Sequence, residues 1–212
     1  MALNKLKFNS LNVTPTAGKT IGFNSSADGL EATLSGGAMT FISKQTASSS
    51  SDIQFTSGID STYKEYLFIF TSLHFSDDAC NFKFNFRDGS SNFDASKSSA
   101  TFKAHHSEDG NTTALAYLDR DVANGTGDQT VAQNIGNAND ESLVGYMHLF
   151  NPSDTTFVTH FVGQTQYYET NNYTETVHFG GHCNIAAAID GVKFDASAGT
   201  IDSGTITLYG IN

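Results

Sequence analysis

The segment His105-His106-Ser107-Glu108-Asp109 is the first candidate for chemistry in this chain. Two imidazoles beside two carboxylates could serve acid–base catalysis or bind a metal ion. The segment closes a predicted β-strand, however, and successive side chains of a strand point to opposite faces. His105 and His106 therefore cannot share one ion without a bulge, and we expect neither a catalytic nor a metal role for them.

A second pair, His178 and His182, stands four residues apart in HFGGHC. On an α-helix that spacing would place both imidazoles on one face, but Gly180 and Gly181 disfavour a helix. On a strand the two histidines share a face about 13 Å apart, at a rise of roughly 3.3 Å per residue. One metal ion cannot bridge that distance unless the glycines fold the chain back, so we expect strand or interface histidines.

Oxygen ligands for a hard cation gather in residues 119–121, an Asp-Arg-Asp triplet, with Asn124 and Asp128 beyond it. The spacing lacks the glycine at the sixth position and the closing glutamate of the helical calcium-binding loop. Residues 119–141 are acidic, rich in Gly and Asn, and almost free of large apolar side chains. We predict a solvated, exposed loop over 119–141, with calcium binding as the alternative. Loops of this length are unusual unless they bind something or contact a subunit.

Tyr167, Tyr168 and Tyr173 form an aromatic, amide-rich stretch in QTQYYETNNYT, between two predicted strands. Tyrosine rings can stack on a sugar or anchor a subunit contact. Strand ends and hairpin packing explain the same residues equally well, so both interpretations stay open. A glycan-binding site would combine these tyrosines with the 119–141 loop.

The sequence contains no catalytic signature. The GxSxG nucleophile elbow, the phosphate-binding loop and the dinucleotide fingerprint are all absent. A glycosidase needs two carboxylates that face each other at roughly 5 to 9.5 Å, and no local pattern singles out such a pair. Tryptophan, which carbohydrate clefts usually display, is also absent. We therefore predict a protein that is not an enzyme and that has no metal or cofactor.

The elements that would position these residues are short strands. In the block Ser51–Phe75, two strand-like runs flank a turn, and the first alternates apolar and polar residues as a half-buried strand does. In the second run, Tyr66–Phe70, the aromatic residues fall on one face, and Leu67 and Ile69 fall on the other. We therefore expect protein to cover both faces of this strand.

Strand-like runs follow one another from residue 39 to residue 211, separated by turn residues. The clearest, Cys80–Arg87, alternates Phe with polar residues and precedes Asp88-Gly89, a hairpin signal. This pattern predicts an all-β fold, an antiparallel β-sandwich resembling a jelly roll, over residues 38–212. The predicted strands are Met39–Gln45, Asp52–Thr56, Tyr63–Leu73, Cys80–Arg87, Ala100–His106, Ala114–Leu118, Leu143–Phe150, Thr156–Gly163, Glu175–Asn184, Ile189–Asp195 and Gly204–Ile211.

Composition supports this class and narrows the partners. The 212 residues are 38% apolar, with 17 Phe and 8 Tyr to fill a core between sheets. A net charge of −11 argues against nucleic acid, whose binding needs clustered Lys and Arg. Cys80 and Cys183 match neither a disulfide framework nor a metal motif, so we predict buried free thiols. Nothing resembles a signal peptide or a membrane span, so we expect a soluble protein made in a cytoplasm, without membrane insertion.

Residues 1–37 form a predicted extended N-terminal arm, interrupted by Gly and Pro. Three lysines give residues 1–27 a charge of +3, whereas residues 28–212, with 8 Lys and Arg and 22 Asp and Glu, carry −14. The arm is too apolar for a plain disordered tail. We predict that it docks on a partner or a neighbouring subunit; the alternative is a tail folded back onto its own domain. The docking residues would be Leu3, Leu6, Phe8, Leu11 and Phe23.

Three segments together resemble a group of tailed-phage virion proteins, chiefly from marine and cyanobacterial phages. They are KLKFNSLNVTPTAGKTIGFNSSADGL, FTSGIDSTYKEYLFIFTSLHF and GTIDSGTITLYGIN, and SLVGYMHLFNPSDTTFVTHF fits the same group. Members of this group look like tail-fibre, head-fibre or capsid-decoration components. The resemblance covers most of the chain and includes no catalytic motif.

The resemblance implies a β-sandwich exposed on the virion surface after synthesis in the host cytoplasm, with other capsid or tail proteins as partners. It implies a homo-oligomer, for which a trimer is one candidate, although nothing in the sequence fixes the number. Our leading hypothesis is a non-enzymatic bacteriophage structural protein whose arm docks while the sandwich projects. The alternative is a carbohydrate-binding module for host attachment that recognises surface glycans. The residues do not distinguish a head from a tail location.

Overall fold

The computed structural model describes residues 20–23, 26, 28–33 and 38–212. The chain divides into two compact units, residues 1–38 and residues 39–212. Within the described ranges, all of the named secondary-structure elements are β-strands. These ranges contain no helix that is long and apolar enough to cross a membrane.

The N-terminal unit contains an antiparallel hairpin of β1 (Thr20–Phe23) and β2 (Leu30–Thr33). Phe23 and Leu30 are register partners, and their side chains are 75% and 38% exposed. Of the predicted docking residues, Phe23 is the one that is described. The other four, Leu3, Leu6, Phe8 and Leu11, lie outside the described residues.

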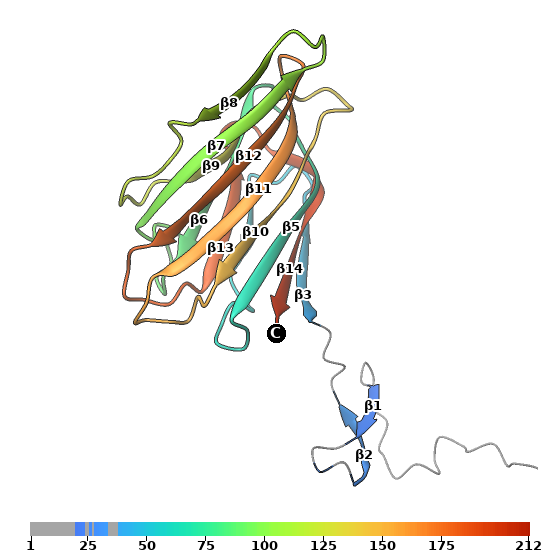
Figure 1. The fold of residues 1–212 in the computed structure, drawn as a ribbon, viewed down its shortest axis with the longest axis vertical. Helices are drawn as coiled ribbons and strands as arrows, with labels where there is room; N and C mark the ends of the chain where they lie inside the picture. Colours follow the sequence, from blue (N-terminus) through green and yellow to red (C-terminus); the bar gives the residue numbers. More distant parts are fainter. Residues whose placement is uncertain (1–19, 24–25, 27, 34–37) are drawn as a thin grey trace, which may run out of the picture. The chain divides into compact units, whose positions relative to one another are not determined.

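The second unit is an antiparallel β-sandwich, as predicted. Its twelve strands form one continuous hydrogen-bonded sheet, which we describe as two parts. The longer sheet has eight strands in the order β3-β14-β5-β10-β11-β12-β7-β8, and the shorter sheet has four in the order β9-β6-β13-β4 (Figure 1). The two sheets join at one corner, where Glu169 of β11 pairs with Ile135 of β9. The strands are β3 (Met39–Thr46), β4 (Asp52–Phe55), β5 (Glu65–Phe75), β6 (Cys80–Arg87), β7 (Lys97–Ser107), β8 (Thr113–Tyr117), β9 (Gln129–Ile135), β10 (Leu143–Phe150), β11 (Thr159–Glu169), β12 (Tyr173–Cys183), β13 (Gly191–Ala196) and β14 (Ile201–Ile211).

Phenylalanine fills the space between the two sheets. Phe70 of β5 meets Phe82 of β6 with ring centroids 5.3 Å apart, and Phe84 of β6 meets Phe161 of β11 at 5.4 Å. Both pairs adopt the edge-to-face geometry that aromatic rings prefer, and all four side chains are buried. The alternation of apolar and polar residues predicted for β6 is therefore confirmed, because every second side chain of that strand lies in the core.

Each of the eleven predicted strands overlaps a strand of the sandwich, and Cys80 and Cys183 are free and buried as predicted. The prediction of one exposed loop over 119–141 is wrong in its second half. That stretch contains β9, whose Gln129, Val131 and Ile135 are fully buried. Gln129 is tolerated there because its amide donates to the carbonyl oxygens of Arg120 and Thr130 at 3.0 and 2.8 Å.

The expectation that protein covers both faces of Tyr66–Phe70 is met fully on one face and only in part on the other within the described chain. Tyr66, Phe68 and Phe70 are buried against the shorter sheet. Leu67 and Ile69 lie on the opposite face of β5, where they are half-buried and no second layer of the sandwich covers them. The apolar second face is therefore real, and within the described chain Leu67 and Ile69 keep part of their surface exposed.

Candidate functional site

The most unusual surface of the sandwich is the face of the eight-stranded sheet that points away from the shorter sheet. Directly opposed residues of antiparallel strands project to the same face, so the pairing register defines continuous rows of side chains. One row runs through Phe41, Tyr209, Leu67, His148, Val162, Gly180 and Ala100. The next runs through Thr207, Ile69, Tyr146, Gln164, His178, Phe102 and Tyr117. We call these two rows, with Leu115 of β8, the outer band.

The outer band is strongly apolar for a surface in water. Six of its large apolar side chains are 40–77% exposed, namely Phe41, Phe102, Leu115, Tyr117, Tyr146 and Val162. Neither row contains an acidic residue, in a chain that has 22 of them. Two carboxylates border the band: Glu65, which hydrogen-bonds His148, and Asp121, which accepts a hydrogen bond from the hydroxyl of Tyr117. Depletion of charge combined with exposed aromatic side chains is the composition of the centre of a protein interface.

Ring contacts fix the aromatic side chains of the outer band. Phe102 stacks on His178 with centroids 4.9 Å apart and planes inclined by 14°. Tyr146 meets the edge of His148 at 5.4 Å, and His148 stacks on Phe150 at 5.9 Å. These side chains have already lost rotamer freedom in the single chain, so covering them costs less conformational entropy than covering free side chains.

An apolar groove of about 370 Å³ crosses the outer band. Gly180 and Ala100 contribute to its floor, and Phe102, Tyr146 and Val162 to its walls. A Cβ atom at Gly180 would lie 3.3 Å from Cγ1 of Val162, so the missing side chain keeps the groove open.

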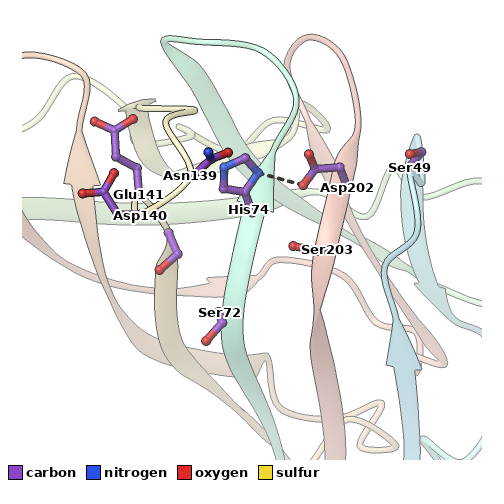
Figure 2. A pocket seen from close by; sticks show the side chains of 9 residues that line it. Ser49, Ser72, His74, Asn139, Asp140, Glu141, Asp202 and Ser203 are labelled. Carbon is purple, nitrogen blue, oxygen red and sulfur yellow. Dashed lines mark hydrogen bonds and ion pairs between the residues drawn. The ribbon is translucent and has the colours of Figure 1, made fainter.

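A second, polar depression of about 610 Å³ lies at the end of the sheet where β5 and β14 meet the loop before β10 (Figure 2). His74 of β5 is its central residue. Its Nδ1 lies 2.8 Å from Oδ1 of Asp202, and its Nε2 lies 3.1 Å from the carbonyl oxygen of Ala138. Asp140 and Glu141 lie on the other side of the depression.

The contacts of His74 argue against a catalytic base in this depression. A carbonyl oxygen accepts hydrogen bonds and cannot donate them, so Nε2 carries a proton, and the Asp202 carboxylate likewise accepts a hydrogen bond from a protonated Nδ1. Burial lowers the pKa of His74, but the bonds to Asp202 and Ala138 outweigh burial and the net direction is upward. Both nitrogens are occupied as donors. Among the described residues, no hydrogen bond joins His74 to a serine hydroxyl.

Glu141 also has a structural role. The carboxylate is 8% exposed and accepts the backbone N–H of Ala138 at 2.6 Å. The hydrogen bonds of His74 and Glu141 therefore hold the loop before β10 against β5 and β14, and both side chains already have partners within the protein. No sequence motif points to this group, because Glu141 follows His74 by 67 residues and Asp202 follows it by 128.

Tyr167 is not a glycan contact, and that prediction is wrong. Its side chain is fully buried, its hydroxyl donates to Oε1 of Glu175 at 2.5 Å, and it accepts the backbone N–H of Gln133 at 3.1 Å. Burial raises the pKa of Tyr167. Tyr167 and Tyr168 are both part of β11, so they point to opposite faces and cannot act together.

Tyr168 and Tyr173 are half-buried, and Tyr173 lines an open depression of about 420 Å³ beside Glu108 and Asn172. The hydroxyl of Tyr168 donates to Oδ1 of Asn172 at 3.2 Å. A hydrogen bond to Glu108 raises the pKa of Tyr168 to about 12. The structure therefore brings two of the three predicted tyrosines near one polar depression and excludes the third.

The candidate metal ligands do not converge. His105 lies 3.6 Å from the buried carboxylate of Glu175, whereas His106 is exposed on the opposite face of β7, as the alternation predicts. His178 and His182 share a face of β12, where His178 contacts Phe102. In the described ranges, no group of three or more His, Cys, Asp or Glu side chains could hold a metal ion.

The Asp119–Asp128 cluster is also divided. Oδ2 of Asp128 pairs with Lys83 at 2.9 Å, and its Oδ1 accepts from Asn85 at 3.0 Å. These contacts commit the Asp128 carboxylate to the shorter sheet, so it is not free to close a calcium loop with the residues at 119–124.

No protein-family model matches the chain, and no curated protein sequence matches it. Among solved structures, the chain is similar to a chain of infectious bursal disease virus, Gx strain, with 12% identity over 91% of this chain and 43% of that one, at a TM-score of 0.17. It is similar to scytalido-glutamic peptidase with 9% identity over 70% and 66% of the chains, at a TM-score of 0.15. Similarity to the VP2 subviral particle of infectious bursal disease virus is 11%, over 91% and 46%, at 0.14. The chain spans less than half the length of these viral chains, and scores this low identify no function.

Proposed function

We propose that this protein is a non-enzymatic structural protein of a bacteriophage virion, exposed on the particle surface and anchored through residues 1–37. In this role it would be a capsid-decoration, head-fibre or tail-fibre component. The proposal joins the resemblance of four sequence segments to tailed-phage virion proteins with one structural observation.

That observation is the division of the chain into two unlike units. Residues 39–212 enclose an aromatic core of their own. The N-terminal unit contains a two-stranded hairpin whose Phe23 is 75% exposed. An isolated two-stranded hairpin is marginal in water, so this unit would gain stability from a partner that covers its apolar side chains. Its positive charge also differs from that of the acidic remainder.

Removal of residues 1–37 tests the anchoring role. The truncated chain should keep the circular dichroism spectrum of a β-sandwich but should be absent from purified particles of the phage that encodes it. Phe157→Glu is a matched control, because Phe157 is an equally exposed aromatic residue in the loop between β10 and β11. Incorporation of the truncated chain at the level of the full chain would contradict the proposal.

A second candidate function, glycan binding for host attachment, is favoured by the depression beside Tyr173. An aromatic ring next to Asn171, Asn172 and Glu108 offers a stacking surface together with amide and carboxylate groups for sugar hydroxyls. This candidate predicts binding on an array of glycans from the host surface. Tyr173→Ala should abolish the signal and Phe157→Ala should preserve it; a signal that both variants retain excludes this depression as the binding site.

A further inference from the structure

We propose that two copies of this protein associate through the outer band, so that the eight-stranded sheet of one copy packs face to face on that of the other. This interface is separate from the anchoring unit and goes beyond the proposed function. The second copy would cover the apolar face of β5 that contains Leu67 and Ile69, which the described part of the single chain covers only in part.

Charge is the first argument that the occupant is a second copy. The chain has a net charge of −11, so two copies repel each other wherever their acidic surfaces meet. The outer band carries no acidic residue in either row; of the carboxylates at its border, Glu65 is bonded to His148, and Asp121 is bonded to Tyr117 at the β8 edge. Two copies can therefore meet over the β3 to β7 part of the band without bringing free carboxylates together, and Asp121 stays at the β8 edge on Tyr117. A basic partner, in contrast, would bind the acidic surfaces and not this one.

Shape is the second argument. A two-fold interface must be complementary to itself, because the same surface serves both partners. The outer band holds both a recess and projections. The groove over Gly180 is apolar, and Leu115 and Tyr117 of the edge strand β8 project with 77% and 63% of their surface exposed. Apolar side chains of one copy therefore have a recess of matching chemistry on the other.

The size of the outer band fits a stable dimer. Eight strands at a spacing of about 4.8 Å span roughly 34 Å. The two rows and the flanking row that ends at Leu115 stand about 6.8 Å apart, so the three rows cover roughly 20 Å along the strands. The resulting area of about 700 Å² is close to the ~800 Å² that each partner buries in a stable interface of standard size. Two twisted sheets pack in this way at about −30° with interdigitated side chains.

The shape of the outer band also favours a two-fold dimer over a three-fold trimer. One flat partner can cover the whole band. Around a three-fold axis, each band would have to divide between two neighbours that approach at an angle. We therefore expect a dimer in solution, with the mass of two 22.7 kDa chains.

Sedimentation equilibrium of the full chain, over about 1 to 100 µM, measures the mass and the Kd for dimerisation. Two substitutions test the band separately: Phe102→Glu on β7, which lines the groove, and Leu115→Glu on the edge strand β8. Both side chains are solvent-exposed in the single chain, so the variants should keep the far-UV circular dichroism and melting temperature of the wild type. Each should raise the Kd by at least about tenfold, as loss of an anchor side chain does.

Phe157→Glu supplies the matched control, because it makes the same change at an exposed aromatic residue outside the outer band. It should leave the Kd unchanged. A native mass other than that of two chains overturns the proposal. A dimer that withstands both band substitutions, or that Phe157→Glu disrupts equally, overturns it as well.

Discussion

His74 and Asp202 join two neighbouring strands through one short contact. Nδ1 of His74 on β5 lies 2.8 Å from Oδ1 of Asp202 on β14 (Figure 2). Nε2 of the same ring reaches the carbonyl oxygen of Ala138 in the loop before β10. The ring therefore ties three segments that are far apart in sequence. Both bonds need a proton on the ring nitrogen, so the protonated imidazole satisfies the whole arrangement.

Replacement of His74 should make stability depend less on pH. The pKa of His74 is raised above its ordinary value of 6.5 in the folded protein. Its stabilising contribution is therefore fully present below pH 6.5 and is lost as the pH rises through the higher folded pKa. Urea unfolding should show His74→Gln destabilised by about 1–2 kcal/mol at pH 5.5 and by less at pH 8.5. Equal differences at the two pH values would refute the assignment, and Asp202→Asn should reproduce the loss at low pH.

Lys97 gives the opposite pH dependence. It is fully buried, and its ammonium group bonds two neutral oxygens, Oδ1 of Asn85 at 2.6 Å and the carbonyl of Ala95 at 3.4 Å. Burial lowers its pKa from 10.5 to about 8. Between pH 8 and pH 10.5 the unfolded chain keeps this proton while the folded protein releases it, so folding becomes more favourable as the pH rises.

Lys97→Met should therefore stabilise the protein at pH 7. At about 1.4 kcal/mol per pKa unit, the cost of the buried charge is up to roughly 3 kcal/mol. Guanidinium unfolding at pH 7 and pH 10 measures it, and the difference between the variant and the wild type should shrink at pH 10. Lys44→Met is the control, since Lys44 is exposed. A variant less stable than the wild type at pH 7 would show that the hydrogen bond to Asn85 outweighs the buried charge.

The strands could be predicted from the sequence where period-2 alternation is strong. Every second residue of Cys80–Arg87 is Phe or Cys, and the structure places those side chains in the core. The strand β9 was missed because its buried residues include Gln129, whose amide is satisfied by backbone carbonyls that only the folded chain brings near. Strand partners were not predictable either, since β14 at the end of the chain lies between β3 and β5.

The candidate surface was only partly predictable. The apolar pair Leu67 and Ile69 signals a second apolar face in the sequence, but the register that aligns it with Tyr146 and Phe102 is a property of the folded sheet. Tyr167 was misassigned because QTQYYETNNYT was read as a connection between strands. Its first tyrosine belongs to β11, where alternation sends it into the interior.

Tyr167→Phe should destabilise the fold without any effect on glycan binding. Removal of the hydroxyl leaves the N–H of Gln133 without its acceptor and takes one donor from Glu175, which is 2% exposed. Unpairing buried polar groups costs about 1–3 kcal/mol. Tyr168→Phe is the matched control, because it removes only exposed hydroxyl bonds, to Asn172 and Glu108, and should leave the melting temperature close to that of the wild type. Equal melting temperatures for the two variants would contradict the buried position of Tyr167.

A comparison of alanine substitutions at Gly204 and Gly89 distinguishes the cost of a steric clash from the cost of a left-handed backbone. Both have positive φ, +100° and +86°. Gly204 lies where the register of β14 shifts against β5, and a Cβ there would approach the carbonyl oxygen of Ser72 to 2.4 Å and Cα of Leu73 to 2.8 Å. A Cβ at Gly89 would meet no atom within 4 Å.

Gly89→Ala should therefore cost about 1–2 kcal/mol, the price of a left-handed backbone for a residue with a side chain. Gly204→Ala carries that cost and must also displace the backbone of β5, so we expect a loss of about 3 kcal/mol or more. Because Asp202 lies two residues away, the displacement should also weaken its bond to His74. Urea unfolding of the two variants at pH 5.5 and pH 8.5 measures both effects: Gly89→Ala should keep the pH dependence that His74 produces, and Gly204→Ala should reduce it. Equal losses of stability at the two glycines would mean that β14 can move away from Ser72 without cost.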